Sequence, residues 1–320
     1  MTRYCDAHIH LSHSKEPFFA PNEQYFCASS CHSKEEFESL GRYLPSGRSG
    51  YPHFRYSLHS SASLRNASDG ATIPTAKDQL IDGAPWQNHR FCQDSLKTRL
   101  ASFAPSGRSL PYVFATYGIH PQSPLLKNKS LIEEELSYME NLIIDKKIIA
   151  IGECGFDFFT PEFRSTATEQ ETVFNEQLFL AQKYNLPLVL HLRKSIEKIF
   201  TYSRQLKKIP AVVFHSFPGT FREAQSLTNH GINAFFSFGK PILNGKKASI
   251  DCVQNLPLQN LLFETDAPYQ TLKGETETFP TDIKKVYRKA CELRKINLEE
   301  LSETVFKNFQ IAFENSVILF

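Results

Sequence analysis

The stretch that decides the fold holds two short apolar runs, Ile148-Ile-Ala-Ile-Gly and Leu188-Val-Leu-His-Leu, separated by residues 168–184. Short apolar runs bounded by turn residues are typical of strands that are buried on both faces. The residues between the runs place apolar side chains at helical spacing, as in one face of an amphipathic helix. Together they predict a strand, a helix and a second strand parallel to the first.

The same alternation extends over most of the chain. Eight apolar runs predict eight strands, at residues 4–11, 25–30, 112–118, 148–152, 188–192, 211–216, 233–238 and 261–265. Helical patterns follow most of them, at residues 130–145, 168–184, 196–206, 221–228, 247–255, 281–294 and 298–309. Strands that alternate with helices in this number favour an α/β fold of the TIM-barrel type, a (β/α)8 barrel with an outer ring of helices.

Residues 45–110 interrupt the pattern between the second and third predicted strands. Residues 46–110 contain 11 serines and carry a net charge of +4, and only residues 91–103 have a helical pattern. We interpret the segment as an irregular insertion. The whole chain, residues 1–320, is then a single barrel domain that contains this insertion.

The composition is that of an ordinary globular protein, with 41% hydrophobic and 22% charged residues. It excludes collagen, coiled-coil and wholly disordered proteins, and a net charge of +2 gives no general sign of nucleic-acid binding. The seven cysteines are scattered and odd in number, which favours a reducing compartment. No apolar run is long enough for a secretory signal or a membrane span. We therefore expect a cytoplasmic monomer without a membrane or protein partner.

Polar side chains gather where the predicted strands end. His8 and His10 end the first strand, and strand alternation places them on the same face. The other strand ends carry His120, Glu153, Asp157, His191, Arg193, His215 and Asp266.

Each of these residues has an ordinary explanation, as a hydrogen-bonded core residue or a helix cap. However, six strands deliver polar groups to the same end, and in a barrel these ends form one mouth. Imidazoles and carboxylates are ligands of divalent metal ions. The sequence therefore predicts a metal site, with room for more than one ion.

At these residues the chain resembles the TatD family of metal-dependent deoxyribonucleases, within the wider amidohydrolase group of barrels. The resemblance covers residues 111–309 and about the first 30 residues. It rests on six motifs: Asp6-Ala-His-Ile-His, Gly118-Ile-His-Pro, Gly152-Glu-Cys-Gly-Phe-Asp, Pro187-Leu-Val-Leu-His-Leu-Arg, His215-Ser-Phe-Pro-Gly and Glu264-Thr-Asp-Ala-Pro-Tyr.

The resemblance implies a ligand set for two divalent ions, Zn²⁺, Mn²⁺ or Mg²⁺. One ion would be bound by His8, His10 and Asp266. The other would be bound by His191 and His215, with Glu153 as the bridge between the two. The resemblance further implies a hydrolase that cleaves nucleic-acid phosphodiester bonds, with DNA as the substrate and cleavage from an end.

Bound divalent ions would activate water and neutralise charge on the phosphate in the transition state. Asp266 is both a ligand and a candidate base, or a ligand only. Arg193 and His120 are candidates for binding phosphate oxygens. Their alternatives are an ion pair at the rim for Arg193 and a hydrogen bond to a ligand for His120. Asp157 either orients a ligand imidazole or caps a helix.

Other functions are compatible with the same pattern. A related metal site can hydrolyse a small-molecule amide, lactone or phosphoester, because the chemistry at the ion is shared. A non-catalytic barrel is a third possibility, which the presence of all six candidate ligands disfavours.

Two further features concern the second predicted strand. If residues 33–40 form the helix that follows this strand, the insertion emerges at the bottom of the barrel. If residues 91–103 form that helix, the insertion lies at the mouth, where its positive charge would attract a polyanion. We favour the bottom. The motif Cys27-x3-Cys31-His32 resembles part of a zinc-binding site. The sequence has no second pair of ligands at a suitable spacing, which favours reduced structural thiols.

Overall fold

The computed structural model describes residues 1–15, 17–44 and 111–313. These residues all belong to one compact unit. The expected insertion over residues 45–110, its helix over residues 91–103 and its location relative to the barrel lie outside the described residues. The single domain over residues 1–320 stays a prediction.

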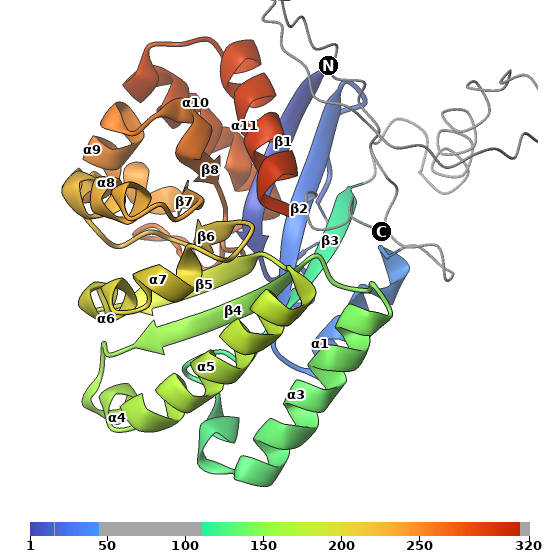
Figure 1. The fold of residues 1–320 in the computed structure, drawn as a ribbon. Coiled ribbons are helices and arrows are strands. Elements are labelled where there is room, and N and C mark those ends of the chain that lie inside the picture. The colour runs from blue at the N-terminus through green and yellow to red at the C-terminus, as the bar shows by residue number, and fades with distance from the viewer. Residues whose placement is uncertain (16, 45–110, 314–320) are drawn as a thin grey trace, which may run out of the picture. The chain divides into compact units, whose positions relative to one another are not determined.

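Eight parallel strands form one sheet in the order β1 to β8, so every strand pairs with its neighbour in sequence (Figure 1). The strands are β1 Thr2–Ile9, β2 Glu23–Cys31, β3 Tyr112–Tyr117, β4 Ala150–Asp157, β5 Leu188–Arg193, β6 Val212–Phe214, β7 Ala234–Phe238 and β8 Leu261–Phe263. The predicted (β/α)8 barrel is confirmed.

Side chains and loop backbone join the last strand to the first. The buried Asp6 carboxylate of β1 accepts hydrogen bonds from the backbone N–H and the hydroxyl of Thr265, at 2.9 and 2.7 Å. The Asp266 N–H donates to the His8 carbonyl at 3.0 Å, just beyond β8. Burial raises the pKa of Asp6 to about 7, against the opposing effect of its hydrogen bonds with Thr265 and Tyr25. The closure of the barrel therefore lies beside the histidines of β1.

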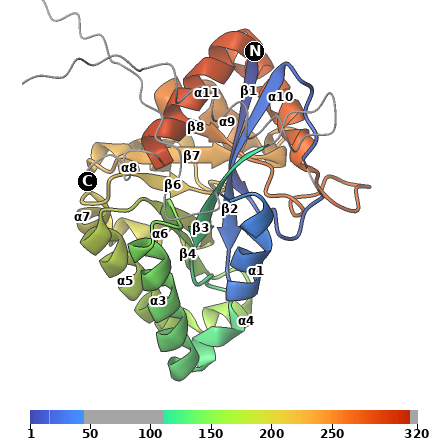
Figure 2. The same cartoon turned by 90° about the vertical axis from the view of Figure 1, so that its right-hand side faces the viewer.

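Helices lie outside the strands in both views, as in an outer ring (Figures 1 and 2). The α-helices are α1 Lys34–Ser39, α3 Lys129–Ile144, α4 Pro161–Arg164, α5 Ala167–Tyr184, α6 Ile196–Phe200, α7 Ser203–Leu206, α8 Phe221–Asn229, α9 Lys247–Asn255, α10 Ile283–Arg294 and α11 Leu298–Phe313. Short 3-10 helices are η1 Leu40–Arg42, η2 Pro124–Lys127, η3 Lys240–Ile242, η4 Leu258–Asn260 and η5 Pro280–Asp282. Helix α5 packs on β4, and α11 packs on β1 and β8.

Several element ends differ from the prediction, and two of the differences have a clear cause in the packing. The fourth strand was predicted to end at Gly152, but β4 continues to Asp157 because it pairs with β5 as far as Arg193. The predicted helix over residues 196–206 is broken into α6 and α7 at Tyr202, whose ring packs against Phe156 and Phe174 and whose hydroxyl bonds to α5. Contacts between neighbouring elements cause both differences. Such contacts cannot be read from the pattern of apolar residues in the sequence.

Among the helices that the structure describes, none combines the length and the apolar character needed to cross a membrane.

Candidate metal centre

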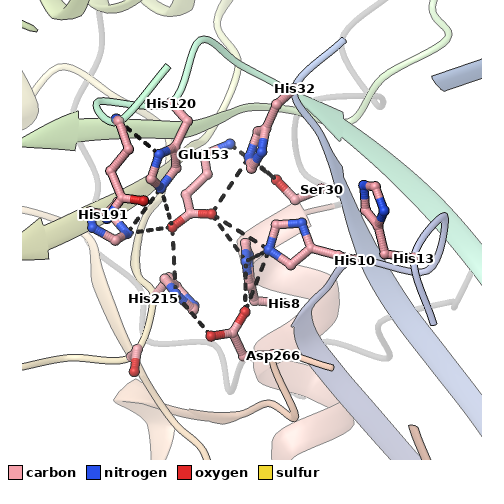
Figure 3. A network of polar contacts seen from close by, with 12 residues as sticks. His8, His10, His13, Ser30, His32, His120, Glu153, His191, His215 and Asp266 are labelled. Atoms are coloured by element: carbon pink, nitrogen blue, oxygen red, sulfur yellow. Dashed lines mark hydrogen bonds and ion pairs between the residues drawn. The ribbon is translucent and has the colours of Figure 1, made fainter. Parts of the chain in front are cut away.

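Four predicted ligands converge at the mouth of the barrel: His8 from β1, His10 just after β1, Glu153 from β4 and Asp266 from the loop after β8 (Figure 3). The Nε2 atoms of His8 and His10 are 3.2 Å apart. Glu153 Oε2 lies 3.3 Å from His8 Nε2 and 3.8 Å from His10 Nε2. Asp266 Oδ1 lies 3.6 and 3.5 Å from the same two nitrogens. These four residues, the first ligand group, are all buried.

The spacing of the first ligand group fits a shared cation. Ligand atoms about 2.1 Å from a tetrahedrally bound ion lie about 3.4 Å apart. The five contacts within the group range from 3.2 to 3.8 Å. Two nitrogens and two carboxylate oxygens that face one centre are also a donor set suited to a divalent ion. The residues present therefore fit the predicted metal.

The other oxygen of Glu153 faces a second ligand group, which consists of Glu153, His191 and His215. Its Oε1 atom lies 2.6 Å from His191 Nδ1 and 3.5 Å from His215 Nε2. The two oxygens of one carboxylate thus point to different sets of imidazoles (Figure 3). This is the arrangement that a bridging ligand requires.

Backbone geometry explains why β4 can carry Glu153 here. A Cβ atom at Gly152 would lie 2.4 Å from the Val189 carbonyl oxygen, and one at Gly155 would lie 2.3 Å from the His191 carbonyl oxygen. Both glycines also adopt positive φ angles, 143° and 132°, which side chains rarely allow. The Glu153 N–H donates to Ser30 Oγ of β2 at 3.2 Å. The glycine-rich motif therefore lets β4 lie close to β5 and fixes the carboxylate between the ligand groups.

Carboxylates behind both histidines of the second ligand group hold the rings in place. His191 Nε2 contacts Asp157 Oδ2 at 3.1 Å, so that Nδ1 faces Glu153. His215 Nδ1 lies 3.1 Å from Glu264 Oε2, so that Nε2 faces Glu153. Such partners fix the ring nitrogen that is available to a metal. Asp157 and Glu264 are both fully buried.

His120 lies beside the second ligand group, but its hydrogen bonds make it a donor. Its Nε2 is 3.3 Å from His191 Nδ1 and 3.4 Å from Glu153 Oε1. The Gln122 backbone N–H donates to its Nδ1 at 3.0 Å, so the neutral ring carries its proton on Nε2. Burial lowers the pKa of His120 to about 4, although Glu153 raises it, so the ring is neutral near pH 7. In this tautomer His120 offers an N–H group to the side of the cavity where Glu153 and His191 lie, although its Nε2 is also within reach of an ion held by those two residues.

The charges of the acidic ligands follow from the imidazoles around them. Burial alone would raise the pKa of Asp266, but His215, His10 and His8 lower it to about 2. Burial likewise opposes ionisation of Glu153, yet His120, His8 and His215 hold its pKa well below the usual range. Both carboxylates are ionised at neutral pH, as metal ligands must be.

These groups open into a cavity of about 700 Å³. Arg193 lies on its rim with 43% of its side chain exposed, 3.8 Å from Asp157 Oδ2. Within the described part of the chain, the Arg193 guanidinium donates no hydrogen bond to protein. Lys246 lines the same cavity, and burial lowers its pKa. The cavity therefore combines metal-ligating groups with nearby cationic donors.

Comparisons with known proteins agree with this geometry. A family model described as TatD related DNase matches residues 84–314. The chain belongs to this TatD-related family. The match does not include His8 and His10, so the convergence of these two residues with Glu153 is an independent observation of the structure.

Relatives of this TatD-family chain fall into two groups by name. The uncharacterized metal-dependent hydrolase YabD of Bacillus subtilis is 30% identical over 209 residues, which are 63% of this chain and 78% of YabD. The 3'-5' ssDNA/RNA exonuclease TatD of Musicola paradisiaca is 32% identical over 217 residues, 68% of this chain and 78% of the relative. Membership of this family makes the chain a metal-dependent hydrolase.

Solved structures show the same fold. The TatD homologue YjjV of Escherichia coli is 26% identical, with a TM-score of 0.57 over 69% of this chain and 82% of YjjV. A TatD-family hydrolase of Entamoeba histolytica has a TM-score of 0.63 over 98% of both chains at 16% identity, which supports the fold alone.

His32 also belongs to the site, although it is not among the site residues predicted from the sequence. It follows β2 directly, and its Nε2 lies 3.6 Å from Glu153 Oε2 and 3.3 Å from Ser30 Oγ. Its ring also contacts the rings of His10 and His120, at centroid distances of 5.2 and 5.0 Å. Its position at a strand end, the signal that identified the other site residues, was sufficient to find it.

Cys27 and Cys31 form no zinc cluster with His32. Both thiols are buried free cysteines, and burial raises the pKa of each. His32 instead faces Glu153. Among the described residues, the side chains grouped closely enough to hold an ion do not include Cys27 or Cys31. Their role as reduced structural thiols stays a prediction.

Proposed function

We propose that this metal-dependent hydrolase cleaves the phosphodiester bonds of DNA and removes nucleotides from an end. Two divalent ions would be held by the two ligand groups, with His8, His10 and Asp266 on one side, His191 and His215 on the other, and Glu153 between them. Mixed nitrogen and oxygen ligands favour Zn²⁺ or Mn²⁺ over Mg²⁺.

One observation carries the proposal for a phosphodiester substrate. The N–H group of His120 and the guanidinium of Arg193 line the same cavity as the two ligand groups. Both donors lie at the cavity wall. His120 Nε2 is 3.3 Å from His191 Nδ1 and 3.4 Å from Glu153 Oε1, and the Arg193 guanidinium has an ion pair with Asp157 at 3.8 Å but makes no hydrogen bond within the described residues. Arg presents planar pairs of donors that match phosphate oxygens. An amide or lactone substrate would give these donors no anion to bind.

Within this proposal each acidic residue has a defined role. When bound, the metal ions lower the pKa of water and neutralise negative charge on the phosphate oxygens. Glu153 positions both ligand groups through its two oxygens. Asp266 contributes Oδ1 to the first ligand group, while Oδ2, which accepts a hydrogen bond from Gln270 at 2.9 Å, takes the proton of the attacking water.

His120 and Arg193 bind the oxygens of the phosphate that is cleaved. A neutral N–H donor at His120 can stabilise negative charge on the phosphate without adding a positive charge beside the metal site. Relatives named as single-stranded DNA and RNA exonucleases support a nucleic-acid substrate.

The test is cleavage by metal-stripped protein to which Mg²⁺, Mn²⁺ or Zn²⁺ is restored. The substrates are end-labelled single-stranded and double-stranded DNA, and the product ladder distinguishes removal of end nucleotides from internal cuts. We expect metal-dependent release of nucleotides, abolished in a Glu153→Ala, His191→Ala double variant. Glu140→Gln is the matched control, because Glu140 binds Lys183 and Tyr184 and does not line the cavity.

Absence of phosphodiester cleavage with every metal, together with hydrolysis of an amide, lactone or small phosphoester, would overturn the proposal. Undiminished DNA cleavage by the double variant would instead identify a contaminating nuclease and favour a non-catalytic barrel.

A further inference from the structure

An aromatic side chain lies exposed on the rim of the polar cavity. Phe159 follows β4 by two residues, lines the cavity and remains 48% exposed. Within the described residues most large apolar side chains are buried, so a half-exposed phenyl ring beside a metal centre is unusual. At this position the ring can contact a ligand that has an apolar, flat face.

Two cations lie close to the ring of Phe159. The guanidinium carbon of Arg193 lies 4.0 Å from the ring centroid, and Lys194 Nζ lies 5.1 Å from it. The Arg193 N–H groups make no hydrogen bond within the described residues, so they are available for an anion while the guanidinium lies over the ring. One pair of side chains thus presents a flat surface and a phosphate-binding edge together.

The backbone of Phe159 is also linked to the second ligand group. The Phe159 N–H donates to Asp157 Oδ1 at 2.8 Å, while Asp157 Oδ2 contacts His191 Nε2 at 3.1 Å. The same carboxylate therefore fixes the backbone of Phe159 and the ring of His191. A group stacked on Phe159 would be held at a defined place relative to a phosphate bound between the ligand groups.

We propose that Phe159 and Arg193 form a stacking platform for the nucleobase next to the phosphate that is cleaved. This inference rests on the proposed function and adds a requirement for the structure of the nucleic-acid substrate. Aromatic rings and Arg guanidinium planes bind unpaired bases by stacking, with little dependence on sequence. A base inside a duplex has both faces covered by its neighbours, so only an unstacked base can occupy the platform. The substrate therefore has an unpaired base at the end that is cleaved.

The test compares two substrates, a single-stranded oligonucleotide and the same oligonucleotide with an abasic terminal nucleotide. Phe159→Leu keeps an apolar side chain but removes the flat ring, whereas Phe159→Tyr keeps the ring. For Phe159→Leu we expect KM to rise about tenfold on the base-bearing substrate, with a much smaller change in kcat. KM on the abasic substrate stays the same, and Phe159→Tyr behaves as the wild type.

Phe179→Leu is the matched control. Phe179 on α5 is 59% exposed but does not line the cavity, so its removal leaves both KM values unchanged. Equal KM values for Phe159→Leu and wild type would overturn the platform. An equal rise on both substrates would also overturn it, because that result means a structural effect without recognition of a base.

A binding measurement separates failure of the platform from failure of the nuclease function. We expect the affinity for the base-bearing oligonucleotide, measured by fluorescence anisotropy in Ca²⁺ without turnover, to fall about tenfold in Phe159→Leu. Base-dependent binding without cleavage under any metal would refute the nuclease proposal and keep the platform. Cleavage without any base-dependent effect of Phe159→Leu would refute the platform alone.

Discussion

Replacement of Asp157 by Asn tests how a buried carboxylate supports the second ligand group. The two Asp157 oxygens face three donors: His191 Nε2 and Gln122 Nε2 at Oδ2, at 3.1 and 2.6 Å, and the Phe159 N–H at Oδ1, at 2.8 Å. These donors overcome the effect of burial and lower the pKa of Asp157 to about 2, so the group is an anion at neutral pH. Asn supplies one oxygen and one NH2 group in place of two acceptors.

The magnitude follows from this count of donors. Whichever way the amide of Asn is turned, its NH2 group faces at least one protein donor. A buried donor left without a partner costs about 1–3 kcal/mol. Loss of a partner that orients a ligand histidine lowers metal affinity by about 10- to 100-fold. That loss corresponds to about 1.4–2.8 kcal/mol of binding free energy.

The assay is calorimetric titration of Mn²⁺ into metal-stripped wild type and Asp157→Asn. We expect the binding step of the second ligand group to weaken about 10- to 100-fold. The step of the first ligand group stays the same, because the side-chain partners of Asp157 are Gln122, Phe159, His191 and Arg193, and none of these belongs to that group. Unchanged affinity at both steps, or equal weakening of both, would refute the reasoning.

Three further predictions concern stability, metal and substrate. Asp282→Asn removes a charged partner of the buried Lys240 ammonium, which lies 2.7 Å from the Asp282 carboxylate, and lowers the free energy of unfolding by about 3 kcal/mol at pH 7. The control Glu303→Gln removes the exposed ion pair with Arg3 and changes the free energy of unfolding by less than about 1 kcal/mol. Burial opposes ionisation of Asp282, but Lys240 lowers its pKa below the usual 3.8; the difference in urea midpoints is therefore present above that pH and disappears as the pH falls through the folded pKa. Chelation by EDTA lowers the thermal midpoint by roughly 4 °C, since a ligand at 100 times its Kd contributes about 2.7 kcal/mol; an unchanged midpoint in calorimetry would contradict metal binding. His120→Ala lowers kcat for DNA about 100-fold without weakening Mn²⁺ binding, and a parallel loss of Mn²⁺ affinity would show that His120 is a ligand after all.

The fold could be predicted from the sequence because a barrel repeats one simple pattern. Each buried strand needs a short apolar run, and each covering helix needs one apolar face. The positions of the strands followed from these runs, whereas their ends did not. Gly152 and Gly155 were predicted to lie at or beyond the end of the fourth strand, yet they belong to β4, because contacts with the neighbouring strand decide where pairing stops.

The site was predictable to the extent that polar side chains follow strands. That rule brought together the six candidate ligands, because parallel strands of a barrel end at one mouth. It could not find the partners of those ligands. Glu264 behind His215 and Ser30 behind Glu153 depend on which side chains meet in space. His32 was overlooked because two nearby cysteines suggested a different explanation for it.

The most direct test of the metal centre is an anomalous-scattering map from crystals of the protein grown with Mn²⁺. Two peaks should appear at the mouth of the barrel, one bounded by His8, His10 and Asp266 and the other by His191 and His215, with Glu153 in contact with both. A map with no peak there, or with Mn²⁺ bound only elsewhere on the protein, would contradict the account.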